Sequence, residues 1–143
     1  MNNKEFTSVE EDYLEVIYFI GKNKKPVKTM QISRYFGNSP STVTEMLQKL
    51  SEKGLLVYEK YRGVSLTKEG LRISRQVAER HRLLSKFLAI LGVPEDIAEE
   101  DACRIEHVVN IETMNRLREF VEFVEISSST RWKEEFYLFK KGM

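Results

Sequence analysis

Two groups of side chains in this sequence have the residue types and the spacing of metal ligands. Glu106 and His107 follow Cys103 by three and four residues, which places a thiol, a carboxylate and an imidazole together on one turn of a helix. Asp12 and Glu15 are three residues apart, so their carboxylates share one face of another helix. Because thiolate, imidazole and carboxylate all bind divalent transition metals, the chemistry that these residues indicate is metal binding.

Each group also has an ordinary structural interpretation. Paired acids such as Asp12 and Glu15 are common at helix starts, where they interact favourably with the helix dipole. Cys103 can be read as a core thiol beside a surface Glu–His pair. His81, the only other histidine, lies near an apolar stripe, where a core residue with satisfied hydrogen bonds is the more common case. The residues alone leave both interpretations open.

No catalytic residues are predicted. The sequence contains no nucleophile motif, no glycine-rich phosphate loop and no general-base constellation beyond the metal candidates. We therefore expect that the protein is not an enzyme. A metal-dependent hydrolase that uses the same acids and histidines is the enzymatic alternative, and turnover that requires metal would favour it.

The elements that must position these residues are mainly helical. Hydrophobic periodicity predicts helices over about 8–21, 29–36, 40–53, 68–91, 95–108 and 111–124, with short β-strands over 55–59 and 64–67. Ser8 and Glu11 have the spacing of a capping box for the first helix. The segment after residue 130 mixes aromatic and basic residues, and we expect a short packed segment there.

The order of elements over the first half is that of a winged helix-turn-helix. A short helix ends at Gly37, Ser39 and Pro40 begin the next helix, and a β-hairpin follows with Lys60–Gly63 at its tip. We predict a mainly α fold with an N-terminal winged helix-turn-helix domain over residues 1–70. A C-terminal helical domain for metal binding and dimerisation is predicted over residues 71–143.

The formal net charge of +1 gives little indication of the partner, so local placement must identify a nucleic-acid surface. The second helix of the pair offers small hydroxyl residues near its start, which suit phosphate contacts, and Gln48, which suits a base edge. The predicted DNA-binding residues are Ser39, Pro40, Ser41, Thr42, Thr44, Gln48 and Lys49 from this helix, with Lys60, Tyr61 and Arg62 from the hairpin tip.

Composition restricts the class of protein and the cellular compartment that we expect. A hydrophobic fraction of 41% and a charged fraction of 31% are typical of a globular protein, and we find no signal peptide and no membrane span. The single cysteine excludes an intrachain disulfide and fits a reducing cytoplasm. The later helices have more apolar surface than a thin module buries, so we expect a homodimer, no membrane partner and no small organic ligand.

Several ordered motifs resemble the diphtheria toxin repressor and manganese transport regulator family of metal-dependent transcriptional regulators. The similarity covers roughly residues 8–125. Its motifs are Glu11–Tyr18, Ser39–Thr44 with Leu47–Leu50, Tyr58–Gly63, Arg80–Leu84 and Cys103–His107. The chain resembles the two-domain form of the family, without the SH3-like domain.

The resemblance implies a specific ligand set. The positions that bind metal in the family match Asp12, Glu15, His81, Cys103, Glu106 and His107 of this sequence. Asp12 and Glu15 match the manganese branch, whereas Cys103 stands where the iron branch has cysteine. Ser85 stands where members commonly have an acidic ligand and Glu99 where the iron branch has histidine, which makes Glu99 an additional candidate. The number of metal sites per subunit, one or two, therefore stays open.

The resemblance also implies a mechanism: metal between the domains sets the distance between two recognition helices on a palindromic DNA operator, about 34 Å. The expected function is repression of metal-uptake genes with Mn²⁺ or Fe²⁺ as cofactor, and Zn²⁺, Co²⁺ or Ni²⁺ would also bind because affinity follows the Irving–Williams order. The alternative is a winged-helix regulator that senses a small molecule or a partner protein and has a structural metal site. DNA binding that ignores chelators would favour it.

Overall fold

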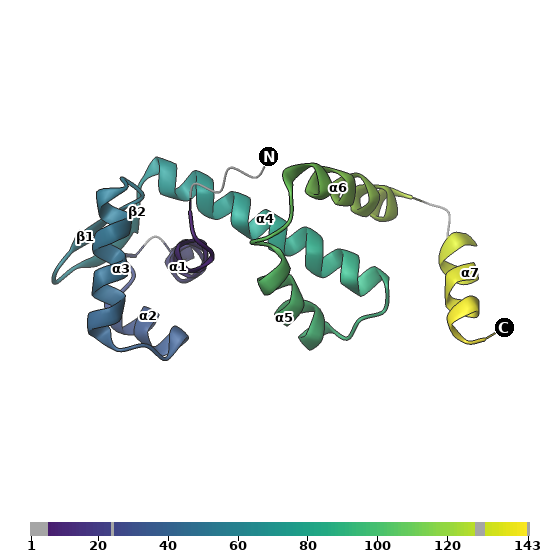
Figure 1. Ribbon diagram of the computed structural model, residues 1–143, viewed down its shortest axis with the longest axis horizontal. Coiled ribbons are helices and arrows are strands. Elements are labelled where there is room, and N and C mark those ends of the chain that lie inside the picture. The colour runs from purple at the N-terminus through teal and green to yellow at the C-terminus, as the bar shows by residue number, and fades with distance from the viewer. Residues whose placement is uncertain (1–5, 24, 128–130, 143) are drawn as a thin grey trace.

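A computed structural model describes residues 6–23, 25–127 and 131–142 of the chain. It is mainly helical with one β-hairpin, as the sequence predicted (Figure 1). In chain order the elements are α1 (Ser8–Ile20), a 3₁₀ turn (Gly21–Asn23), α2 (Thr29–Phe36), α3 (Pro40–Glu52), β1 (Leu56–Glu59), β2 (Gly63–Leu66), α4 (Lys68–Ile90), α5 (Glu95–Ile105), α6 (Ile111–Ile126) and α7 (Arg131–Lys140).

The helix-turn-helix forms where its local signals predicted it. Gly37 ends α2 in the left-handed conformation at φ 69°, which glycine adopts without steric cost. Ser39 caps α3, with its hydroxyl oxygen accepting a hydrogen bond from the Thr42 backbone N–H at 3.3 Å, and Pro40 occupies the first helical position.

The start of α1 differs from the prediction. The capping residue is Thr7, whose backbone is extended, and its partner in the capping box is Glu10. The predicted pair of Ser8 and Glu11 is wrong because Ser8 is already the first helical residue. The side chain of Glu11 is consequently free for contacts elsewhere.

The wing is a two-stranded antiparallel hairpin in which Leu56 pairs with Leu66 and Glu59 with Gly63. Val27 adds an isolated bridge to Val64 through two backbone hydrogen bonds of 2.8 Å. Gly63 has a φ of +111°, and a Cβ atom there would lie 2.5 Å from the Val27 carbonyl oxygen. Only glycine therefore fits this corner of the wing.

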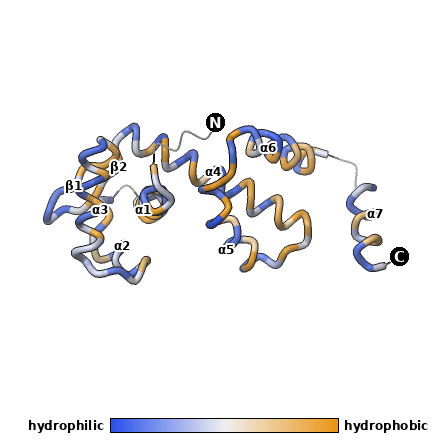
Figure 2. The backbone as a smooth tube through the Cα atoms, viewed as in Figure 1, coloured by the Kyte–Doolittle hydropathy of each residue, from blue (hydrophilic) through white to orange (hydrophobic). Residues whose placement is uncertain are grey.

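Two hydrophobic clusters make up the core, and α4 belongs to both. The first contains Leu14 and Ile17 of α1 and Leu47 of α3, with Ile73 and Val77 from the start of α4. The second packs Leu83 and Leu84, further along α4, against residues of α5 and α6. Figure 2 shows hydrophobic segments along both halves of α4 and in the helices packed on them. Since α4 is continuous, it connects the two halves of the molecule.

Helix α5 ends earlier than predicted. The predicted helix extended to about residue 108, but the last helical residue is Ile105 and Glu106 is the C-terminal cap. His107 therefore lies in the turn before α6, so it does not continue the helical face of Cys103. The six candidate ligands consequently come from four places: α1, α4, α5 and the turn after α5.

Helix α7 forms where a short packed segment was expected, but none of its residues is buried. Helix α7 contacts α6 through Trp132, whose ring lies edge-on to that of Phe120 with centroids 6.2 Å apart. Figure 1 shows α7 at the end of the molecule opposite the wing. Among the described residues, no helix is long and apolar enough to cross a membrane.

Candidate metal centre and nucleic-acid interface

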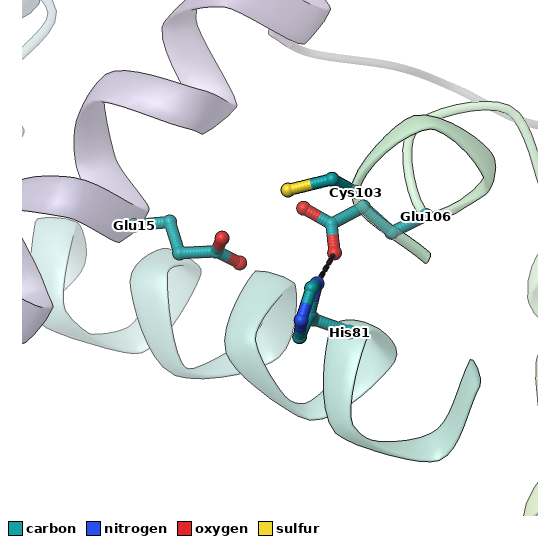
Figure 3. A group of neighbouring side chains, drawn as sticks. All are labelled: Glu15, His81, Cys103 and Glu106. Carbon is teal, nitrogen blue, oxygen red and sulfur yellow. Dashed lines mark hydrogen bonds and ion pairs between the residues drawn. The ribbon is translucent and has the colours of Figure 1, made fainter. Parts of the chain in front are cut away.

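Four side chains converge in the space enclosed by α1, α4 and α5 (Figure 3). They are Glu15, His81, Cys103 and Glu106, and one ligand atom from each lies within 4.8 Å of the others. Glu15 comes from α1, His81 from the middle of α4, and Cys103 and Glu106 from the end of α5. Residues far apart in the chain thus provide two carboxylates, a thiol and an imidazole at one point.

A second group lies beside the first and shares one residue with it. Asp12, Glu106 and His107 also offer ligand atoms within 4.8 Å of one another. Together the two groups contain the six residues predicted as ligands. Cys103 and His107, which the spacing placed on one helical turn, fall into different groups because α5 ends between them.

The acidic residues at the centre are buried and only partly compensated, because His81 pairs with Glu106. Glu15 is 8% exposed and Glu106 is 1% exposed. Glu15 Oε2 and Glu106 Oε1 have no hydrogen-bond partner within the described parts of the chain. Burial, and then repulsion from Glu106, raise the pKa of Glu15 to about 7. Buried carboxylate oxygens that lack a donor fit a divalent cation, which would supply the missing positive charge.

The two histidines and the cysteine hold their protons firmly. The hydrogen bond with Glu106 raises the pKa of His81 to about 9 despite its burial. Burial lowers the pKa of His107, but hydrogen bonds with Asp12 and Glu11 outweigh it and raise the value to about 9. Burial and the surrounding carboxylates raise the pKa of Cys103 to about 11. A metal must therefore displace protons to bind here.

Glu11 is a residue of the site that the sequence reasoning missed. It is 6% exposed, and its Oε1 atom lies 3.1 Å from His107 Nδ1. Its other carboxylate oxygen accepts a hydrogen bond from Arg80 of α4. Burial raises the pKa of Glu11, but His107 and Arg80 outweigh this effect and lower it. Glu11 is thus an ionised link between α1, α4 and the turn after α5.

Glu99, the additional candidate ligand, lies at the outer edge of the site. Its Oε2 atom is 2.7 Å from His81 Nε2, whereas Nδ1 of the same ring faces Glu106 at 2.8 Å. Ser85 donates a hydrogen bond of 2.8 Å to Glu99 Oε1. The side chain of Glu99 is 55% exposed, and neither ligand group contains it. The structure therefore separates Glu99 from the six clustered residues.

The predicted DNA-binding residues of α3 form one exposed strip. The strip contains Ser39, Pro40, Ser41, Thr42, Gln48 and Lys49, all of which are exposed. Thr44 is only partly exposed, and its hydroxyl donates to the Pro40 carbonyl oxygen at 2.8 Å. The structure thus leaves the hydroxyl of Thr44 less available to a phosphate than the sequence suggested.

The wing tip is a second exposed surface in the same half of the molecule. Lys60, Tyr61 and Arg62 are exposed, with Tyr61 87% accessible. Lys28 contacts this tip, because its Nζ atom donates to the Arg62 carbonyl oxygen at 2.8 Å. Lys28 therefore links the wing tip to the start of α2 by a hydrogen bond.

Comparison with known families matches both halves of the chain. Residues 5–64 match the family model described as "Iron dependent repressor, N-terminal DNA binding domain". Residues 67–130 match the one described as "Iron dependent repressor, metal binding and dimerisation domain". The two matches meet at the start of α4.

Curated relatives are similar over most of their length. An HTH-type transcriptional regulator of Methanocaldococcus jannaschii is 40% identical over 114 residues, which cover 78% of this chain and 91% of the relative. The HTH-type transcriptional regulator MntR of Bacillus subtilis is 38% identical over 115 residues, or 80% of this chain and 81% of the relative. Both relatives are named as transcriptional regulators.

Solved structures share the fold. A manganese-dependent transcriptional repressor in complex with manganese superposes with a TM-score of 0.73 at 34% identity, over 80% of this chain and 53% of that chain. The manganese regulator SloR gives a TM-score of 0.70 at 30% identity, over 80% of this chain and 54% of that one. The chain thus spans about half the length of these solved regulators.

Proposed function

The chain belongs to the diphtheria toxin repressor and manganese transport regulator family of metal-dependent transcriptional regulators, and from this premise we propose that it represses metal-uptake genes when divalent metal is plentiful. One observation carries the proposal. The candidate ligands Asp12 and Glu15 belong to a helix of the DNA-binding core, whereas Cys103, Glu106 and His107 belong to the other half. Metal occupancy and the arrangement of the two halves are therefore coupled.

The proposed ligands are the six residues of the two groups, with Glu106 shared between two adjacent positions. A bound divalent cation would supply the positive charge that the buried carboxylates lack. Mn²⁺ or Fe²⁺ suits a set dominated by carboxylate and imidazole, while the thiol of Cys103 adds affinity for softer metals such as Zn²⁺. One related structure is a manganese complex, and the regulator ScaR was solved with Zn²⁺ and with Cd²⁺.

The chain's own residues act by exchanging partners. His107 Nε2 lies 2.6 Å from Asp12 Oδ1, so the ring and the carboxylate satisfy each other. Metal binding requires that His81, His107 and Cys103 release protons and that Glu15 be ionised. With a divalent cation bound, the same side chains would hold α1 against α5 through coordination instead of hydrogen bonds.

A route from the site to the recognition helix begins one residue after Asp12. The ring of Tyr13 is stacked on that of Phe36 at a centroid distance of 4.5 Å, and its hydroxyl accepts a hydrogen bond of 3.3 Å from Asn38. Asn38 directly precedes Ser39, the cap of α3. Because these contacts are close-packed, a displacement of α1 moves the start of α3 with it.

We further propose that two copies of the chain bind a palindromic operator, with α3 in the major groove and the wing on neighbouring phosphates. The match to a dimerisation domain and the exposed apolar residues of α6 support a homodimer; Phe123 is 53% and Ile126 83% exposed. In this arrangement the metal-dependent angle between the halves sets the separation of the two recognition helices.

The test is operator binding at one stated salt concentration, because affinity for DNA depends steeply on salt. A duplex is first selected from random sequences with protein in Mn²⁺ and, separately, in chelator. Its affinity is then measured in chelator and in titrated Mn²⁺, anaerobic Fe²⁺, Zn²⁺ and Co²⁺. Tight binding only with metal supports the proposal. Equal binding with and without metal would instead favour the regulator that senses another ligand.

A further inference from the structure

Each candidate ligand histidine directs one ring nitrogen into the ligand cluster and the other toward a carboxylate outside it. In His81 the inner atom is Nδ1, which lies 2.8 Å from Glu106 Oε2, as Figure 3 shows. Its outer atom, Nε2, lies 2.7 Å from Glu99 Oε2. In His107 the order is reversed, because Nε2 faces Asp12 at 2.6 Å and Nδ1 faces Glu11 at 3.1 Å.

We propose that Glu99 and Glu11 are positioning residues that present opposite ring nitrogens to the metal, Nδ1 of His81 and Nε2 of His107. The inference rests on the proposed function, since it assumes that these histidines are ligands. It reassigns Glu99 from candidate ligand to outer partner and gives Glu11 a role that the sequence did not indicate.

Both outer carboxylates have a partner on each oxygen, and neither belongs to a ligand group. Ser85 donates to Glu99 Oε1 at 2.8 Å, so each oxygen of Glu99 has a partner. Arg80 donates to Glu11 Oε2, so the same is true of Glu11. By contrast, Glu15 and Glu106, which belong to the ligand groups, each retain a buried oxygen without a hydrogen bond in the described structure.

The physical reason for such partners is the chemistry of imidazole. A neutral ring has one N–H and one lone pair, and a metal can only use the nitrogen with the lone pair. A carboxylate that accepts the outer N–H therefore fixes both the tautomer and the orientation of the ring, and it makes the inner nitrogen a better donor. Loss of such an outer partner typically weakens metal affinity by about 10- to 100-fold.

The two positioning residues are not equivalent. Glu11 is 6% exposed and is held by a charged residue, Arg80, so its hydrogen bond with His107 is shielded from water. The side chain of Glu99 is 55% exposed and is held by a neutral hydroxyl. We therefore expect the larger loss of affinity at Glu11, at the upper end of about 10- to 100-fold, and the smaller at Glu99.

The first measurement is Mn²⁺ affinity in matched variants. Glu99→Ala removes the acceptor at an exposed position and should weaken binding by about tenfold, with Glu99→Gln intermediate because the amide oxygen still accepts the N–H. Glu100→Ala is the control, since it removes an equal charge from the next residue of α5, which pairs with Arg104 instead. For the buried position, Glu11→Gln is compared with Glu10→Gln, whose carboxylate pairs with Lys53.

The second measurement reads the tautomers directly and needs no substitution. The chain has only two histidines, so ¹⁵N-histidine NMR of the Zn²⁺-loaded wild-type protein gives two separable ring systems. We expect His81 to be bound through Nδ1 and to carry its proton on Nε2, and His107 to show the opposite arrangement. In Glu99→Ala, the Nε2 proton of His81 should exchange faster with water.

The outcomes separate this inference from the proposed function. If the wild-type protein binds neither Mn²⁺ nor Zn²⁺, the proposed metal site itself fails. If it binds metal but His81 coordinates through Nε2, or both histidines use the same nitrogen, the positioning roles are overturned. Mn²⁺ affinities of Glu99→Ala and Glu100→Ala that agree within twofold would overturn the role of Glu99. The same agreement between Glu11→Gln and Glu10→Gln would overturn that of Glu11.

Discussion

Replacing Glu15 by glutamine should stabilise the metal-free protein while weakening its response to metal. The Glu15 carboxylate is 8% exposed, has one oxygen without a hydrogen bond among the described residues and lies beside Glu106. Such a group is costly when ionised and useful only when a cation joins it. Glutamine keeps the shape and removes the charge, so the two effects are expected to have opposite signs.

The magnitude follows from the pKa. The folded value is about 7 against an ordinary 4.5, and each pKa unit corresponds to about 1.4 kcal/mol. Because the folded pKa is raised, the folded state binds the proton more tightly than the unfolded state, and stability is lost as pH rises toward and through about 7. At pH 8 the ionised Glu15 therefore costs about 3 kcal/mol, and at pH 5 less than about 1 kcal/mol.

The assay is urea unfolding of the wild-type and Glu15→Gln proteins in chelator at pH 5 and pH 8, at one protein concentration because dimers gain stability with concentration. We expect Glu15→Gln to be more stable by up to about 3 kcal/mol at pH 8 and nearly equal at pH 5. Added Mn²⁺ should raise the melting temperature of the wild-type protein more than that of the variant.

Glu10→Gln is the matched control, because Glu10 is 1% exposed on the same helix but forms an ion pair of 2.6 Å with Lys53. Burial raises the pKa of Glu10, but the hydrogen bond from Lys53 and those at Thr7 outweigh it, so the pKa is lowered. This variant should be destabilised at pH 8, with the loss shrinking toward low pH. A Glu15→Gln protein that is less stable than wild type at pH 8, as Glu10→Gln should be, would refute the reasoning.

Further predictions concern protons, metal preference and DNA. Mn²⁺ binding at pH 7 should release between about three and four protons, since the pKa values of His81 and His107 are about 9, that of Cys103 is about 11 and that of Glu15 is about 7. Calorimetry in two buffers of different ionisation enthalpy measures the number, and a release below one would contradict the ligand set. Cys103→Glu should shift the preference from Zn²⁺ toward Mn²⁺ by about tenfold in a competition titration, because the thiolate favours softer metals; an unchanged ratio would exclude the thiol as a ligand. Lys60→Ala should weaken binding to all DNA sequences and reduce the salt slope by about 1, whereas Lys133→Ala on the exposed face of α7 should change neither.

The DNA-binding half could be predicted because short local signals determine it. Gly37, Ser39 and Pro40 fix the turn between α2 and α3, and Gly63 fixes the wing tip through a backbone conformation that other residues rarely adopt. These preferences act within a few residues. The pairing of Val27 with Val64 joins residues far apart in the chain, so no local pattern indicates it.

The site was harder to predict because its contacts are distant in sequence. Glu11 lies 96 positions from His107, and its spacing from Ser8 imitates a capping box that Thr7 and Glu10 form instead. The end of α5 has no glycine or proline to mark it. Glu106 caps α5 with a helical backbone conformation and His107 lies in the turn after it, and their side chains reach His81 and Asp12, respectively.

The central claim is that the metal site and the DNA surface are energetically coupled. Linkage makes this claim testable from the metal side, because metal and DNA must alter each other's affinity by the same factor. The most direct measurement is therefore Mn²⁺ affinity with and without saturating operator duplex. The account predicts that operator tightens Mn²⁺ binding by the factor by which Mn²⁺ tightens operator binding, about 5- to 150-fold for typical allosteric coupling. An Mn²⁺ affinity that is unchanged by operator would contradict it.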